Sequence, residues 1–389
     1  MLAATVRVTR DLDTAEEAVQ DAYVQALTTW ARDGVPARPG AWLTTAARNN
    51  ALNVLRRRQT LATKLPLLLE PETTEAPEPD TIPDDRLRLI FTCCHPALAP
   101  EARIALTLRL VCGVTTPDIA RAFLVAEPTM AARLTRAKKK ITAARIPYTV
   151  PSAADLPERV DTVLTVLHLL YTTGHTARSG EDLVLDELTG RALDLARLLR
   201  LLLPDDREVA GLLALLLVHH ARRATRTDPH GRLLRLDEQD RSRWDTTSIA
   251  EADRLVVAAL TAGAPGRFTL QAAIAALHAQ APSYDETDWP QILKLYDALL
   301  RVWPTPVVAL NRAVAVSMVD GPAAALAEVE ALEHDGRLAG YHYLPATKAD
   351  LLRRLGRDAE AAEAYQAALA LSGNSAEQEF LAERVRETS

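Results

Sequence analysis

The 389-residue sequence has little glycine, few aromatic residues and few cysteines. Glycine contributes 15 residues and aromatic residues 4%, whereas alanine and leucine dominate the apolar 48%. Alanine and leucine favour helices, and sheets are built mainly from β-branched and aromatic residues. We therefore expect an all-α fold and exclude propellers, sandwiches and glycine-rich nucleotide folds. Three cysteines, two of them adjacent, cannot form a secreted disulfide framework.

Long apolar segments are also missing. The longest uninterrupted apolar run, Val209–Val218, has about half of the roughly 20 residues that a membrane-spanning helix needs. The N-terminal stretch carries Arg7, Arg10 and Asp11, unlike a signal peptide. We expect a soluble, cytoplasmic protein of two or three domains with no membrane partner.

Charge is divided unevenly along the chain. Met1–Pro147 holds 20 basic and 16 acidic residues, whereas the remainder has a net charge of −10. Ala41–Lys64 and Pro128–Arg145 are basic and contain no acid, and Glu70–Asp85 between them holds seven acids, four prolines and no base. Two basic helical blocks joined by an acidic, extended linker indicate a polyanionic partner bound at two places. Solvated surface faces are the alternative.

The first 60 residues predict two helices. Asp13, Thr14 and Glu16 open an amphipathic helix, and Gly34–Gly40 interrupts it. Its apolar positions follow helical spacing, at Ala15, Val19, Ala22 and Ala26, and Glu16, Glu17, Gln20 and Asp21 are expected to face outward. A second helix is expected from Ala41 to about Arg58. On it Asn49, Asn53 and Arg56 share one face beside Arg48, where they could pair with bases and phosphates, although a solvated surface helix is slightly favoured on this evidence.

Residues 115–141 predict a helix-turn-helix. Thr116 is the expected hydroxyl N-cap, followed by Pro117 and Asp118 in the first turn. This short helix should run to about Phe123, and a second helix should begin near Glu127. The second helix has a stripe for burial, at Met130, Leu134, Ala137 and Ile141, and an opposite polar stripe, at Thr129, Arg133, Arg136 and Lys140. Such a helix can enter the major groove, and a generic helical hairpin with a basic tail is the alternative.

Taken in order, these segments resemble a known family. "DLDTAEEAVQDAYVQALTTW", "RPGAWLTTAARNNALNVLRRR" and "TTPDIARAFLVAEPTMAARLTRAKKKI" look like regions 2.2, 2.3–2.4 and 4.2 of extracytoplasmic-function sigma factors, which belong to the sigma-70 family. "FTCCHPALAPEARIALTLRLVCGVTT" resembles the start of their region 4. The whole chain is most similar to the subgroup with a long helical C-terminal extension that ends in tetratricopeptide-like repeats.

The resemblance implies a bacterial initiation factor with no enzymatic activity and no cofactor, whose partners are core RNA polymerase and promoter DNA. The acidic linker would occupy the RNA exit path of the polymerase. Residues implied to contact the polymerase are Asp13, Glu16, Glu17, Gln20 and Asp21. Residues implied to bind the −10 element are Arg48, Asn49, Asn53, Arg56 and Arg57. Residues implied to bind the −35 element are Thr129, Arg133, Arg136, Lys139 and Lys140.

Three features depart from the family pattern. Members usually have another helical turn or more before "VTRDLD", so region 2 is expected to be short at its N-terminus. Asn53 stands where the family commonly has aspartate, and Pro128 where a small residue such as glycine is usual. The last two leave promoter preference open.

The remaining 240 residues predict helix after helix. Leu- and Ala-rich helices are expected at Asp161–Tyr171, Glu187–Leu203 and Glu208–Arg223. Gly321 and Gly356 lie 35 residues apart, near the 34-residue period of tetratricopeptide repeats. In the second repeat the expected packing positions are Ala349, Gly356, Ala361, Tyr365 and Ala368, and Pro306–Leu332 matches more loosely. Such stacked hairpins form grooves for protein partners.

These observations divide the chain into five parts: region 2 at 1–62, the acidic linker at 63–85, region 4 at 86–147, a helical domain at 155–285 and the repeats at 286–385. Polar clusters at His219–Arg223 and Asp237–Asp245 are interpreted as salt bridges at helix ends, with a buried ion-pair network or an effector pocket as the alternatives.

The sequence favours a sigma factor whose activity depends on its extension. Cys93, Cys94 and His95 are adjacent, which is poor spacing for one tetrahedral metal ion, so we interpret both cysteines as small buried apolar residues. No catalytic constellation is visible after Leu156. The alternative function is a stand-alone helix-turn-helix regulator that senses a ligand or peptide through its repeats.

Overall fold

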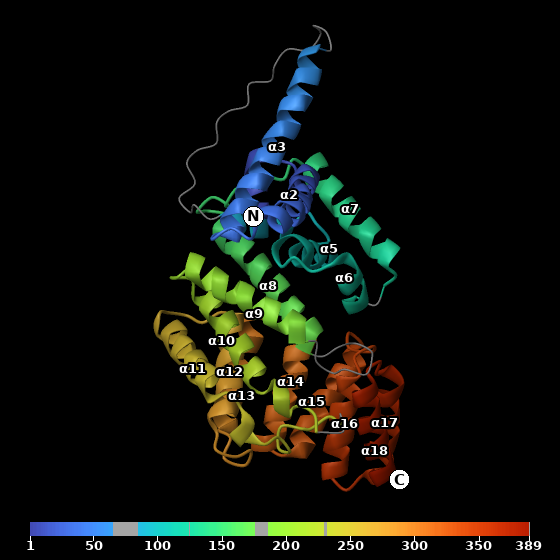
Figure 1. The fold of residues 1–389 in the computed structure, drawn as a ribbon. Coiled ribbons are helices and arrows are strands. Elements are labelled where there is room, and N and C mark those ends of the chain that lie inside the picture. Colours follow the sequence, from blue (N-terminus) through green and yellow to red (C-terminus); the bar gives the residue numbers. More distant parts are fainter. Residues whose placement is uncertain (65–84, 124, 176–185, 229–231, 389) are drawn as a thin grey trace. The chain divides into compact units, whose positions relative to one another are not determined.

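The computed structural model describes the chain except residues 65–84, 124, 176–185, 229–231 and 389. Within the described residues it contains helices and no strand (Figure 1), which confirms the predicted all-α fold. None of the described helices is long and apolar enough to cross a membrane. The chain forms two compact units, Met1–Val166 and Leu167–Ser389. The linker predicted at 63–85 lies almost wholly outside the described residues, and its described ends belong to the helices Pro39–Lys64 and Asp85–Cys93.

The first unit contains α-helices of very different lengths, from the seven residues of Pro100–Leu106 to the 26 of Pro39–Lys64. Its elements in chain order are α1 (Leu2–Thr9), α2 (Leu12–Asp33), α3 (Pro39–Lys64), α4 (Asp85–Cys93), α5 (Pro100–Leu106), the π-helix η1 (Thr107–Val111), α6 (Thr116–Ala122), α7 (Glu127–Ala143) and α8 (Leu156–His175), which continues into the second unit. The second helix was expected from Ala41 to Arg58, and α3 is longer at both ends. Pro39 starts this helix instead of interrupting the chain, since proline is tolerated in a first helical turn.

Alanine allows α1, α2 and α3 to pack closely. Ala15, Ala18 and Ala22 of α2 are fully buried, as are Ala47 and Ala51 of α3. The α2 stripe predicted from helical spacing is therefore confirmed, with Val19 only half-buried. Asp11 caps α2 by accepting the Thr14 N–H at 2.8 Å.

Larger side chains form the core around α4 to α7. Phe91, Leu106, Ile119 and Met130 are completely or almost completely buried. Tyr148, after α7, connects this core to the N-terminal helices, because its hydroxyl lies 2.7 Å from the Ala3 carbonyl oxygen and 2.9 Å from that of Asp85. Regions far apart in sequence are thus packed together within the first unit.

The second unit is a succession of helices. They are α9 (Asp186–Leu202), α10 (Arg207–Ala221), α11 (Thr246–Thr261), α12 (Arg267–Gln280), α13 (Trp289–Val302), α14 (Pro306–Val319), α15 (Pro322–Asp335), α16 (Tyr343–Arg354), α17 (Asp358–Leu371) and α18 (Ser375–Thr388), with short 3-10 turns η2 (Arg223–Thr225) and η3 (Arg241–Arg243). The helices expected at Asp161–Tyr171, Glu187–Leu203 and Glu208–Arg223 are present as α8, α9 and α10.

The apolar run Val209–Val218 is the centre of the second unit. It lies in α10, which packs against α9, α11 and α12, and all its residues are buried. Gly211 permits the close approach of α12, because a Cβ atom there would lie 2.6 Å from the Thr269 nitrogen. Glu208 accepts the N–H groups of Phe268 (2.8 Å) and Thr269 (3.2 Å) and so caps α12. The longest apolar run is therefore a core helix.

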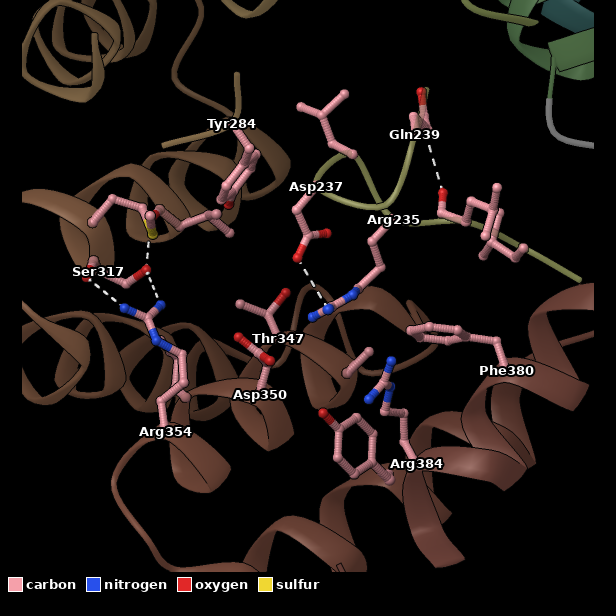
Figure 2. Close-up of a pocket in the computed structure, with 18 of the residues that line it drawn as sticks. Arg235, Asp237, Gln239, Tyr284, Ser317, Thr347, Asp350, Arg354, Phe380 and Arg384 are labelled. Atoms are coloured by element: carbon pink, nitrogen blue, oxygen red, sulfur yellow. Dashed lines mark hydrogen bonds and ion pairs between the residues drawn. The ribbon is translucent and has the colours of Figure 1, made fainter. Parts of the chain in front are cut away.

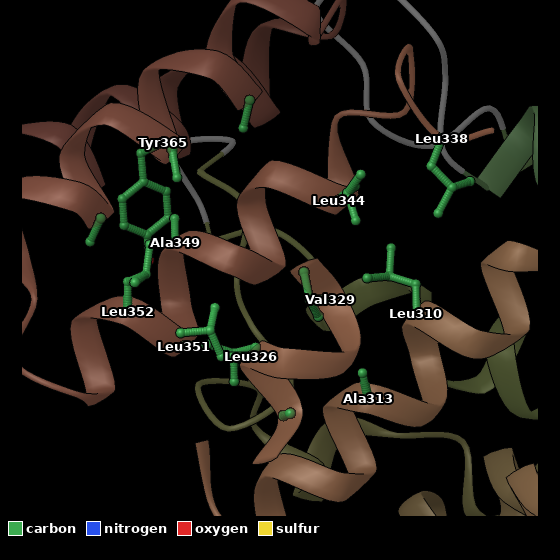
Figure 3. Close-up of a cluster of buried hydrophobic side chains, with 14 of the residues drawn as sticks. Leu310, Ala313, Leu326, Val329, Leu338, Leu344, Ala349, Leu351, Leu352 and Tyr365 are labelled. Carbon is green, nitrogen blue, oxygen red and sulfur yellow. The ribbon is translucent and has the colours of Figure 1, made fainter. Parts of the chain in front are cut away.

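From α12 onward each helix packs against the next one in the chain. The two expected repeats correspond to the hairpins α14–α15 and α16–α17. Figure 3 shows Leu310, Leu326 and Val329 of the first hairpin in one buried cluster with residues of the second. Four of the predicted packing positions behave as expected, because Ala349, Ala361, Tyr365 and Ala368 are buried. Gly356 has φ of 73°, a conformation that favours glycine between helices.

Candidate nucleic-acid interface

The first basic block lies on the outward face of α3. Ala47 and Ala51 face the core, and Asn50 fixes the helix to α2 by donating from Nδ2 to the Ala18 carbonyl at 3.3 Å. The predicted −10-binding residues are all exposed, namely Arg48, Asn49, Asn53, Arg56 and Arg57. Because α3 contains no acid, this face presents amide and guanidinium donors to a polyanion.

The second basic block, Pro128–Arg145, lies mainly in α7, which follows α6 as the predicted helix pair. The N-terminal cap of α6 differs from the prediction. The Asp118 N–H donates to Thr115 Oγ1 at 3.4 Å, and the Thr115 hydroxyl donates back to the Asp118 carboxylate. The predicted cap, Thr116, is instead the first residue of α6. The reciprocal hydrogen bonds between Thr115 and Asp118 resemble a capping box and place the cap one residue earlier than predicted.

Helix α7 has the two predicted faces. Met130, Leu134, Ala137 and Ile141 are buried, whereas Thr129, Arg136, Lys139 and Lys140 are exposed. Arg133 is half-buried because its guanidinium lies over the Phe123 ring, 5.9 Å from the centroid. This cation–π contact with the residue that follows α6 holds the guanidinium of Arg133 in one orientation.

Lys138 of α7 does not share the exposed basic face. It donates to Asp13 at 2.9 Å and also to Glu16, and Arg109 Nε lies 3.4 Å from Glu16. Burial disfavours the charged form of Lys138, but these two hydrogen bonds outweigh it and raise the lysine pKa. The sequence-based expectation that Glu16 faces outward was wrong, because only 16% of its side chain is exposed.

The predicted polymerase-binding set is therefore divided within the first unit. Glu16 is largely covered in its pair with Lys138, whereas Asp13 contacts the same lysine but stays exposed, as do Glu17, Gln20 and Asp21. Sequence reasoning missed the apolar continuation of this face, since Val24 and Leu27 are 60% and 75% exposed. The signal was the helical spacing of both residues from Gln20. Helix α2 thus presents a mixed acidic and apolar surface of the kind that interfaces use.

The paired cysteines belong to the core. Cys93 and Cys94 are almost completely buried, and Cys94 Sγ lies 3.5 Å from Thr107 Oγ1. Burial raises the pKa of Cys94 to about 11 and that of Cys93 well above its usual range. Both thiols are therefore protonated at neutral pH, and no cluster of three metal-ligating side chains occurs among the described residues.

The polar clusters of the second unit are not simply salt bridges at helix ends. His219 is half-buried beside Arg222, whose Nη2 lies 3.1 Å from His219 Nδ1. Asp240 and Asp245 instead accept backbone N–H groups and cap η3 and α11. The structure thus corrects the interpretation of the first cluster, because α10 is central to the domain and its last turn is covered.

The two basic faces lie in segments of the chain that match known protein families. Residues 2–60 match the family model "Sigma-70 region 2", residues 88–141 match "Sigma-70, region 4", and residues 159–260 match a family of unknown function (DUF6596). An uncharacterised protein of Rhizobium meliloti (strain 1021) is 44% identical over 388 residues, which cover 98% of this chain and 91% of the relative.

Region 2 contains α3, and region 4 contains the helix pair α6–α7. Their presence in one chain, each with an exposed basic face, indicates a protein that binds RNA polymerase and DNA in promoter recognition. Such factors are initiation factors and not enzymes. The chain belongs to the sigma-70 family of RNA polymerase sigma factors.

Proposed function

We propose that this protein is an extracytoplasmic-function sigma factor that acts in the bacterial cytoplasm and requires its C-terminal extension. In this proposal α3 contacts the −10 element and α7 the −35 element, and the exposed face of α2 contacts core polymerase. The observation that carries the proposal is that α3 and α7 each have an exposed basic face opposite a face of buried small or apolar residues. The hairpins α14–α15 and α16–α17 supply a surface for a further protein partner.

Binding to promoter DNA should depend on the polymerase. The purified protein should bind duplex DNA weakly, and specific open complexes should form only when core enzyme is added. Electrophoretic mobility shifts and in vitro transcription on a genomic fragment library measure the two properties. Tight operator binding by the protein alone, unaffected by core polymerase, would instead identify a stand-alone regulator.

Two residues of α7 should differ in how they act on DNA. Arg133→Ala should weaken binding to a cognate −35 element by roughly 1–3 kcal/mol and relax the sequence preference at one base pair. The reason is that an oriented guanidinium can form hydrogen bonds with a base edge. Lys140→Ala should weaken binding to all DNA sequences alike. It should also reduce the number of ions released on binding, measured from the salt dependence of the affinity, by about one. Binding of holoenzyme to a −35 sequence library at several salt concentrations measures both effects.

Arg301→Ala is the matched control, since Arg301 is an exposed arginine of the second unit and should leave binding unchanged. Equal and sequence-independent losses in Arg133→Ala and Lys140→Ala would show that Arg133 contacts phosphate only.

A further inference from the structure

A cavity of about 430 Å³ lies within the second unit. One wall is the segment 233–239, and most of the remaining lining comes from α14, α16 and α18, with Arg226, Tyr284 and Tyr365 of α17 at its edges (Figure 2). These three helices alternate along the stacked hairpins, so they are the ones that can line one common face of the stack. The volume is within the range of specific ligand sites.

Positive charge exceeds negative charge in this cavity. The charged lining residues are Arg226, Arg235, Arg354, Arg384, Asp237 and Asp350. This excess contrasts with the extension as a whole, because residues 148–389 carry a net charge of −10. A local reversal of sign favours an anionic ligand.

Arg235 and Arg384 have carboxylate partners, but Arg354 does not. Arg235 pairs with Asp237 at 3.0 Å, and Arg384 pairs with Glu387 at 2.6 Å. Arg354 donates to the Ser317 hydroxyl at 2.8 Å and to the Ser317 carbonyl at 3.0 Å (Figure 2), and both acceptors are neutral. Among the described residues no carboxylate lies within ion-pair distance of Arg354. A guanidinium has five N–H donors, so a held Arg354 retains donors for a carboxylate.

Apolar side chains lie beside the charged ones. Leu236, Val314, Met318 and Phe380 line the same cavity, and Val314 is 37% exposed. A ligand that matches this lining carries an apolar group next to its negative charge.

We propose that this cavity binds an extended peptide of a protein partner, through an acidic side chain that pairs with Arg354 and a neighbouring apolar side chain. The proposal rests on the partner-binding role proposed for the extension and specifies the chemistry of that partner. A peptide is favoured over a free carboxylate because most of the helical lining comes from α14, α16 and α18 of a stack of hairpins, and such stacks expose continuous grooves.

Peptide selection on the full-length protein tests this proposal without polymerase. A phage library of random nine-residue peptides is selected against the immobilised protein, and a selected peptide is then labelled with fluorescein for anisotropy titration. We expect selected sequences to contain Asp or Glu beside Leu, Ile, Val or Phe, and we expect the Asn or Gln version of the selected peptide to bind about tenfold more weakly.

Two substitutions at one position provide matched variants. Val314→Glu places a negative charge at the cavity and should weaken the peptide at least about tenfold, whereas Val314→Lys should bind it as well or more tightly. Both change an exposed apolar residue in the same way apart from sign, and circular dichroism checks that both fold. Arg354→Gln should resemble Val314→Glu, and Arg301→Gln on α13 should resemble the unaltered protein.

Three outcomes would overturn the proposal. Selected peptides could lack acids, Val314→Glu and Val314→Lys could act alike, or N-acetylaspartate could stabilise the protein in a thermal-shift assay while no peptide is selected. The last result would assign the cavity to a small carboxylate. Since no assay here uses transcription, failure of peptide binding is separate from failure of the initiation function.

Discussion

Promoter-specific transcription is expected to disappear when the residues after Val150 are removed. The extension then contributes none of its hairpin surface, and no partner can be recruited through it. Reporter transcription from the cognate promoter measures the effect, with protein levels checked by immunoblot. We expect a loss to background and not a partial decrease, because the whole second unit is absent.

A second truncation separates loss of the extension from damage to the sigma regions. Arg159 of α8 donates to the Phe91 carbonyl at 2.6 Å within the first unit, so removal after Val150 also removes a contact of region 4. Truncation after Thr172 retains that contact and should be equally inactive. A truncated protein that accumulates normally and transcribes more strongly than the full chain would establish that the extension is an inhibitor.

A smaller deletion should have a severe effect as well. Removal from Gly340 takes away α16, α17 and α18, and so uncovers Leu310, Leu326 and Val329, which pack against them. Exposure of this apolar surface destabilises the remaining stack, since each hairpin is buried by its neighbours. The same reporter and immunoblot assays distinguish lost activity from lost protein.

The second unit is expected to lose stability steeply below pH 6.5. Burial, together with nearby arginines, lowers the pKa of His168 to about 4, that of His278 to about 4 and that of His175 to about 2. Burial also lowers the pKa of His219 well below its usual value. These rings are neutral in the folded domain.

The sign of this pH dependence follows from the difference in proton binding between the unfolded and the folded states. Unfolded histidine has a pKa of about 6.5, so between pH 6.5 and 4 the unfolded chain binds protons that the folded domain does not. The stabilisation is present above pH 6.5 and is lost as pH falls, completely by about pH 4 for His168 and His278. At pH 5, protonation of each of His168, His175 and His278 in the unfolded chain should lower the free energy of unfolding by about 2 kcal/mol.

Thermal melting of the full chain from pH 7.5 to 5 measures this loss. His168→Leu removes one titrating ring from beside Phe268, 5.6 Å between centroids, and should flatten the pH dependence. His334→Gln is the control, because His334 is exposed on α15 and should leave the dependence unchanged. A melting temperature that does not change between pH 7.5 and 5 would contradict the prediction that these histidines are neutral in the folded unit.

The sequence by itself determined the helices and the faces of the DNA-binding elements. Burial of Met130 and Leu134 and exposure of Arg136 follow from the 3.6-residue period, which depends on local backbone geometry alone. The sequence also predicted a helix at Glu208–Arg223 whose apolar run, Val209–Val218, is too short for a membrane span, and its burial in the core was seen only in the structure. Alternating hairpins after Pro306 were also readable, because Gly321 and Gly356 mark turns at a regular interval.

Only the tertiary structure decided which side chains meet across helices. Nothing in the sequence near Glu16 indicates Lys138, 122 residues away. The contact between the rings of His175 and His219 likewise joins two helices that the sequence treats separately. The excess positive charge around Arg354 is likewise invisible in a segment whose overall charge is negative. Helical periodicity specifies a face, but the partner of that face is set by long-range packing, where local sequence carries little information.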